Sequence, residues 1–229
     1  KNLMGGFKMA DVINGISNIL TAFISMDSFE ISEAFQGPAA YVVGTFLAIV
    51  GGYLIMLVLR AVPFLDKYFE KTVLVTTYLI IATVIFVEVI RRFVFQVQAP
   101  WSTTLPPYLF LIMTWVGCAY NTRLRAHLRF TEFRANLPRT GQLLCLTLDA
   151  VLWVTFAIIV IVTTIKQTAN SASNFQILLG TDDVMQWWFY ICVPLSWMVL
   201  SGRVIENVID DYRRYRTGEQ MILPSGLGT

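Results

Sequence analysis

Long apolar runs dominate the chain, and polar residues gather between these runs. The runs are uninterrupted rather than amphipathic, which is typical of helices that cross a membrane. A bilayer core of about 30 Å needs about 20 residues of helix. Five runs meet or approach that length, and the predicted spans are residues 38–59, 72–95, 105–121, 142–165 and 184–202.

Proline positions refine three of these predicted helices. Pro38 suits a first helical turn, where its missing N–H needs no partner. Pro106 and Pro107 stand at the start of the third span. Pro194 lies near the middle of the fifth span and should kink it, because proline clashes with the carbonyl group four residues earlier.

Residues 1–37 have a different pattern, with apolar side chains at helical spacing and polar side chains on the opposite face. This pattern predicts an amphipathic amino-terminal helix. Such a helix can lie along the membrane surface or pack against a partner protein, and the sequence favours neither. The apolar face consists of Val12, Ile13, Ile16, Ile19, Leu20, Phe23 and Ile24.

Composition agrees with a membrane protein. Hydrophobic residues make up 56% of the 229 residues and charged residues 14%, compared with about 45–50% and about 25% in soluble domains. Mean hydropathy is +0.63. The expected fold is therefore an all-α integral membrane protein with five transmembrane helices. The net charge of +2 gives no reason to expect nucleic-acid binding.

Few side chains are suited to catalysis or to binding a metal or cofactor. The three cysteines, Cys118, Cys145 and Cys192, lie inside apolar runs without a CxxC pair, and His127 is the single histidine. One histidine cannot supply two axial ligands to haem. No nucleotide-binding, zinc-protease or nucleophile-elbow motif occurs. We therefore expect no cofactor, no metal site and no enzyme activity.

Basic residues predict the orientation, because short cytoplasmic loops are rich in Lys and Arg. Twelve of the seventeen basic residues follow the first, third and fifth spans, whereas segments 96–104 and 167–183 contain none. The amino terminus is expected outside and the carboxyl terminus inside. Arg91 and Arg92 are the exception, since they lie near the outer end of the second span.

Charged and aromatic residues within the spans are the candidates for partner or lipid contacts. Glu88 precedes Arg91 and Arg92 by three and four residues, a spacing at which helical side chains meet, so we expect them to pair, snorkel or face another protein. Asp149 is expected to hydrogen-bond inside the helix bundle near the cytoplasmic side. The tryptophans are interpreted as membrane-interface residues: Trp101, Trp115, Trp153, Trp187, Trp188 and Trp197.

The stretch 65–130 resembles the small membrane subunit of tripartite ATP-independent periplasmic (TRAP) transporters. The second predicted span of the chain, residues 72–95, ends in the run Arg92-Phe93-Val94-Phe95, and a tryptophan follows in the outer loop. The next span closes on small, aromatic and basic residues. The residues that carry the later part of the resemblance are Trp101, Gly117, Tyr120, Arg123 and His127.

This resemblance implies a scaffold-type subunit of a sodium-coupled importer of an organic acid. Its partners would be a large TRAP membrane subunit, a periplasmic substrate-binding protein and membrane lipids. The implied layout is an amphipathic segment 1–37, an extra span 38–60, a four-helix domain 61–206 and a cytoplasmic tail 207–229. Ser102, Thr103 and Thr104 stand where the family usually has acidic residues.

Two other classes of function compete with this one. The first is a non-catalytic helical subunit of an unrelated membrane complex. The second is an intramembrane enzyme, which would require Glu88, Asp149 and His127 to converge although their expected depths differ. The expected contacts with partner or lipid involve Glu88, Arg91, Arg92, Trp101, Gly117, Arg123, His127 and Asp149.

Overall fold

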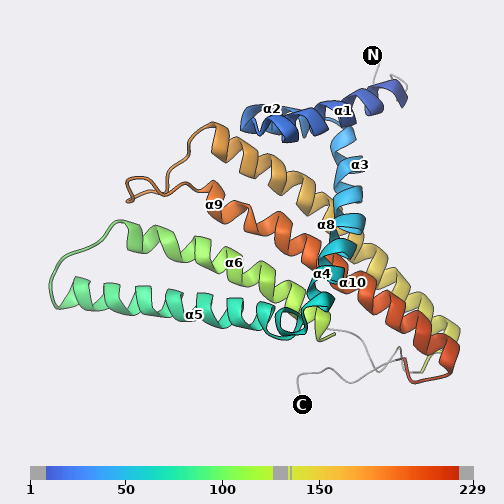
Figure 1. Ribbon diagram of the computed structural model, residues 1–229. Coiled ribbons are helices and arrows are strands. Elements are labelled where there is room, and N and C mark those ends of the chain that lie inside the picture. The colour runs from blue at the N-terminus through green and yellow to red at the C-terminus, as the bar shows by residue number, and fades with distance from the viewer. Residues whose placement is uncertain (1–8, 126–133, 135, 222–229) are drawn as a thin grey trace.

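The computed structural model describes residues 9–125, 134 and 136–221, and helices make up nearly all of this part (Figure 1). The all-α prediction is confirmed. In chain order the helices are α1 (Met9–Ser25), α2 (Ser28–Ala34), α3 (Ala39–Phe46), a π-helical turn (Leu47–Gly51), α4 (Gly52–Ala61), α5 (Pro63–Phe93), α6 (Trp101–Arg123), α8 (Arg139–Ser173), α9 (Trp187–Tyr190) and α10 (Cys192–Thr217).

Four helical stretches of the described chain are long and apolar enough to cross a membrane: Ala39–Ala61, Pro63–Phe93, Arg139–Ser173 and Trp187–Thr217. They correspond to the first, second, fourth and fifth predicted spans, with boundaries that differ by up to a few residues at the ends of the first, second and fifth. The third predicted span, residues 105–121, lies inside α6. This helix is long enough to cross but more polar than the other four stretches, so its crossing stays a prediction.

Proline explains two of the helix boundaries. The fifth predicted span is interrupted at Ile191, between α9 and α10, and Pro194 follows in the first turn of α10. The interruption lies close to Pro194, where the sequence predicts a kink, and the kink itself stays a prediction. Helix α6 begins at Trp101, earlier than predicted, so Pro106 and Pro107 are its sixth and seventh residues and lie inside the helix. They lie past the first four N–H groups, which have no partner within a helix, so each proline removes one backbone hydrogen bond from α6.

The longest helices lie side by side in the order α8, α10, α6, α5, and the stretch α3–α4 crosses α8 and α10 obliquely (Figure 1). Trp197 of α10 lies at the centre of the core and is 1% exposed. Its ring centroid is 5.2 Å from that of Trp115 and 5.1 Å from that of Phe156. The interpretation of Trp197 as an interface residue is therefore wrong, because its side chain is buried against aromatic residues of α6 and α8.

Two glycines permit the crossing of α4 over α10. A Cβ atom on Gly202 would lie 2.5 Å from the carbonyl oxygen of Gly52, and a Cβ on Gly52 would lie 2.9 Å from the backbone nitrogen of Gly202. The two backbones are thus in direct contact. Small residues at such crossings are a common device for packing helices within membranes.

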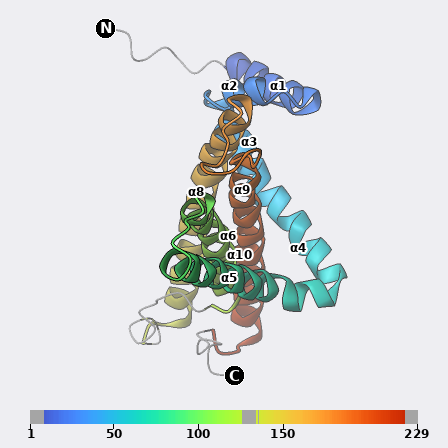
Figure 2. The same ribbon diagram turned by 90° about the vertical axis from the view of Figure 1, so that its left-hand side faces the viewer.

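Helices α1 and α2 lie together at one end of the α3–α4 stretch, and α2 packs against the end of α8 (Figure 2). Ile19 and Phe35 pack with Ala39 of α3 and Val162 of α8. The Asp27 side chain caps α2 by accepting a hydrogen bond from the Phe29 N–H at 2.8 Å. Other apolar residues of α1, including Ile13 and Ile24, remain exposed. A membrane surface or a partner protein can cover them, as the sequence predicts.

The two connections predicted to lie outside the membrane meet in the structure. Gly180, in the connection before α9, has φ +82° and approaches the backbone of Pro100 and Trp101 so closely that a Cβ would lie 2.6 Å from it. The Thr104 hydroxyl donates a hydrogen bond to the Leu179 carbonyl at 2.7 Å. Both connections therefore lie at the same end of the bundle.

Replacing Gly202 with leucine should separate α4 from α10, because the new side chain would have to displace the backbone of Gly52. We expect the free energy of unfolding to fall by about 1–3 kcal/mol or more. A thermal-melting measurement on the purified protein checks this. Gly37→Ala is the control, since nothing lies within 4 Å of its added Cβ. Equal melting temperatures for both variants would contradict the crossing.

Cysteine labelling tests the predicted orientation. In a variant that lacks the three native cysteines, single cysteines replace Asp183, in the connection before α9, or Arg213, near the end of α10. An impermeant thiol reagent should label position 183 in intact cells and position 213 only after the cells are opened. Labelling of both positions from outside would refute the orientation.

Candidate functional site

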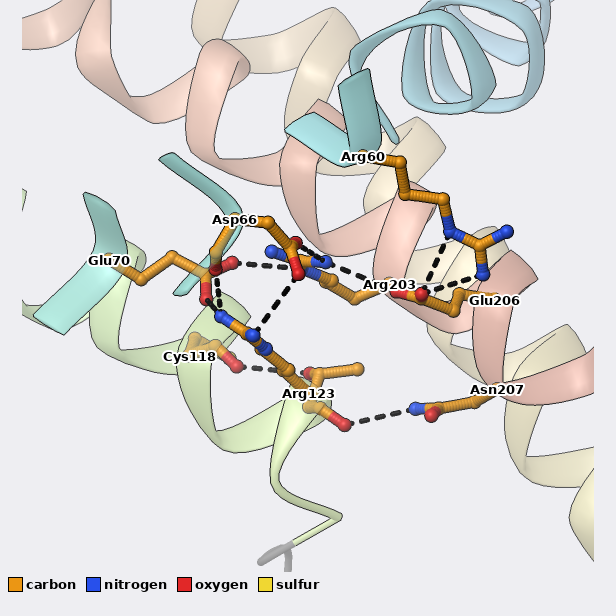
Figure 3. Close-up of polar contacts among 9 residues, drawn as sticks. Arg60, Asp66, Glu70, Cys118, Arg123, Arg203, Glu206 and Asn207 are labelled. Carbon is orange, nitrogen blue, oxygen red and sulfur yellow. Dashed lines mark hydrogen bonds and ion pairs between the residues drawn. The ribbon is translucent and has the colours of Figure 1, made fainter. Parts of the chain in front are cut away.

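Six charged side chains meet where α4 ends and α5 begins (Figure 3). This group, called here the ion-pair cluster, contains three arginines and three acids, so its formal charges cancel. Four helices supply these side chains, which come from segments far apart in the sequence. The members are Arg60 of α4, Asp66 and Glu70 of α5, Arg123 of α6, and Arg203 and Glu206 of α10.

Arg203 lies at the centre of the ion-pair cluster. Its Nε is 3.0 Å from Glu70 Oε1, and its Nη1 is 2.7 Å from Asp66 Oδ1 and 3.1 Å from Glu206 Oε2. The side chains of Arg203 and Glu70 are 2% and 1% exposed. A buried pair of this kind depends on good geometry, because both ions lose their hydration.

Arg123 and Arg60 extend the cluster to both sides. Arg123 reaches the same two acids from α6, with Nη2 3.2 Å from Asp66 Oδ2 and Nη1 3.4 Å from Glu70 Oε2. Arg60 binds Glu206 Oε1 through Nη2 at 2.7 Å and Nε at 3.1 Å. The cluster therefore holds four helices together through charge-assisted hydrogen bonds.

The local sequence explains how α5 presents its two acids to the cluster. Val62 is extended, as residues before proline tend to be, and Pro63 then starts α5. Asp66 and Glu70 are four residues apart and so share one helical face. This places both acids in the first two turns of α5, next to the end of α4.

A second group of charges lines a cavity of about 160 Å³ between the end of α6, α8 and α10. Arg134 binds both carboxylate oxygens of Asp149, with Nη2 3.0 Å from Oδ1. Arg125 pairs with Asp211. The hydrogen bonds to Asp149 raise the pKa of the Arg134 guanidinium above its usual value. The hydrogen bonding predicted for Asp149 is confirmed.

Glu88, Arg91 and Arg92 do not form the internal pair that their spacing suggests. Glu88 Oε1 accepts a hydrogen bond from the Ala99 N–H at 3.3 Å and so ties the following connection to α5. Within the described part of the chain, neither arginine forms an ion pair. Both lie beside exposed apolar residues, Phe93 and Val94 among them.

The remaining candidates are dispersed. Gly117 lies in the contact between α6 and α5, where a Cβ would be 3.2 Å from Leu74 Cδ2. Trp101 begins α6 at the opposite end of the bundle from the ion-pair cluster and is partly exposed. His127 lies outside the described residues. Of the residues predicted as a site, the structure therefore brings Arg123 into the ion-pair cluster and leaves the others apart.

Sequence reasoning missed five members of the cluster, although the sequence holds a signal for four of them. Asp66 and Glu70 are spaced i, i+4, and Arg203 and Glu206 are spaced i, i+3, each pair at the edge of an apolar run. Charges repeated on one helical face at such an edge indicate a contact with another helix. Nothing in the sequence indicates that these two pairs contact each other.

The chain is similar to a known protein family. The model of the family described as "Tripartite ATP-independent periplasmic transporters, DctQ component" matches residues 81–214, more than half of the chain. No curated protein matches the chain. The matched range contains Arg123, Arg203 and Glu206, whereas Arg60, Asp66 and Glu70 precede it.

Removing the charge of Glu70 tests the cluster. Glu70→Gln leaves the buried Arg203 without its most deeply buried countercharge, and breaking a buried pair costs about 3–5 kcal/mol. We expect a clear fall in thermal stability in detergent. Asp210→Asn is the control, since Asp210 lies 3.9 Å from the exposed Arg213 and should contribute about 0–1 kcal/mol. If Glu70→Gln melts like the control, the cluster does not stabilise the fold.

Proposed function

The chain belongs to the DctQ-component family of TRAP transporters, and we propose that it is the scaffold subunit of a sodium-coupled importer of an organic acid. As a member of this family it is the small subunit of a TRAP transporter and a multi-pass protein of the inner membrane. The family assignment favours this function over a subunit of an unrelated membrane complex and over an intramembrane enzyme.

The observation that carries the scaffold role is how the carboxylates between the helices are paired. Glu70 and Asp66 are bound by arginines from other helices. Asp149 and Asp211 are also bound by arginines. These carboxylates hold helices and connections in place, whereas a transport site needs carboxylates or carbonyl groups that can bind and release an ion. A rigid subunit of this kind would support a moving large subunit.

The proposal assigns the other functions to the partners. The large TRAP membrane subunit would carry the sodium sites and the path of the substrate, and a periplasmic binding protein would deliver a carboxylate such as a dicarboxylate or a sugar acid. The family match over residues 81–214 supports a shared membrane domain for α5, α6, α8 and α10, which the proposed layout places at 61–206. Segments 1–37 and 38–60 would be additions to this domain.

Reconstitution tests the proposal. Proteoliposomes that contain this chain and its large subunit, with the binding protein outside, should take up a labelled organic acid when a sodium gradient is imposed. Liposomes with this chain alone should show no uptake, because the substrate path belongs to the large subunit. Replacing sodium with potassium is the control for coupling.

Each part of the proposal would be contradicted by a different result. Uptake by this chain alone would refute the scaffold role. Full uptake by the large subunit without this chain would show that the chain is not needed for transport. Uptake that is the same in potassium would refute sodium coupling.

A further inference from the structure

Among the four described stretches that are long and apolar enough to cross a membrane, helix α5 is the least covered. Along its length it packs against α6, and near its start it contacts α4. Only 6% of its most apolar stretch is buried, compared with 28% for α8 and 50% for Trp187–Thr217. Its exposed apolar side chains extend over most of its length and include Val75, Tyr78, Leu79, Ile80, Ile85, Phe86, Val89 and Phe93.

The exposed side of α5 contains a shallow groove of about 290 Å³, lined by Thr76, Leu79, Ile80, Thr83 and Val84. The Thr83 hydroxyl donates to the Leu79 carbonyl of the same helix at 2.7 Å. Its hydrogen-bonding capacity is therefore used within α5, and the groove presents apolar surface. Such a groove suits the side-chain ridge of a second helix.

Helix α8 has a comparable exposed apolar face at the opposite edge of the bundle (Figure 1). It consists of Leu144, Leu148, Val151, Leu152, Phe156 and Ile159. Lys166 follows on α8, and polar residues such as Gln167 and Asn170 come directly after it. This lysine lies at the polar boundary, where a flexible cation reaches water or lipid headgroups by itself. The α8 face therefore needs only lipid.

Charge distinguishes the α5 face from the α8 face. Arg91 and Arg92 are followed by the exposed apolar residues Phe93, Val94 and Phe95, so the chain stays apolar beyond the two arginines. Within the described residues neither arginine has an ion-pair partner, and the nearby Glu88 carboxylate is hydrogen-bonded to the Ala99 N–H. Guanidinium groups in an apolar zone require an anion close by.

We propose that α5 is the docking helix for the large membrane subunit, whose apolar helix fills the groove from Thr76 to Val84 and whose carboxylate binds Arg91 and Arg92. This inference rests on the proposed function, which supplies the partner. A carboxylate on a helix can be held at the depth of the two arginines, whereas lipid phosphates are confined to the surface. Arginine suits this contact because its guanidinium holds a carboxylate with two parallel hydrogen bonds.

Photo-crosslinking in the assembled complex tests the docking face. Leu79 of α5 is 57% exposed and Leu148 of α8 is 59% exposed, so they form a matched pair of leucines on the two faces. Each is replaced in turn by benzoylphenylalanine, and the chain is co-expressed with a tagged large subunit. Irradiation should crosslink position 79 to the large subunit and position 148 to lipid only. Crosslinking at 148 and not at 79, or lipid adducts alone at 79, would overturn the proposal.

A charge series tests the outer contact. In the double variant Arg91→Gln and Arg92→Gln, recovery of the large subunit with the tagged chain should fall at least about tenfold, as expected when hydrogen bonds to a charged group are lost. The Lys variants at both positions should recover part of the binding, since they keep the charge but lose the paired geometry. Lys166→Gln is the matched control and should leave recovery unchanged. Normal recovery of the double Gln variant would overturn the role of the two arginines.

The outcomes distinguish a failure of the proposed function from a failure of the docking face on α5. If the unaltered chain does not co-purify with its large subunit, the proposed function fails and the docking face fails with it. If the unaltered chain co-purifies but crosslinks only through α8, the proposed function stands and the docking face is wrong. The crosslinking needs no change at Arg91 or Arg92, so it decides the face even if the double Gln variant is misfolded.

Discussion

A charge that leaves water must meet an opposite charge, and this requirement organises the end of the bundle where α4 meets α5. Arg203 and Glu70 are almost fully buried, and each provides the other with an opposite charge that replaces lost hydration. Asp66, Glu206, Arg123 and Arg60 complete a neutral group around them. Because its members come from α4, α5, α6 and α10, the position of each of these helices depends on the other three.

The ion-pair cluster and the glycine crossing act on the same pair of helices in different ways. At Gly52 and Gly202 the backbones of α4 and α10 touch, which sets their separation. Further along, Arg60 binds Glu206 and sets how the two helices are turned relative to each other. Apolar packing alone is permissive about rotation, because lipid and neighbouring helices offer similar surroundings to an apolar side chain. A directed ion pair removes that freedom.

Apolar runs allowed most of the helices to be predicted, because long apolar stretches have few alternatives to a membrane helix. Helix ends were harder to predict: α6 begins before Pro106, and α10 continues to Thr217, well past the apolar run. The ion-pair cluster was not predicted, since Glu70 and Arg203 are 133 residues apart and no local rule links them. For Glu88 the prediction went wrong in another way. Its helical spacing predicted a pair with Arg91 or Arg92, but its carboxylate accepts a hydrogen bond from the Ala99 N–H instead.

The two ends of α5 differ in a way that apolar length cannot explain. At its start, Asp66 and Glu70 are bound by arginines of α6 and α10, so this end is held by the chain itself. At its other end, Arg91 and Arg92 have no such partner within the described residues. A helix that buries one charged end and leaves two cations in an apolar zone at the other is incomplete as a free-standing element. This difference between the two ends of α5 fits a subunit whose own fold holds the start of the helix and whose partner subunit holds the other end.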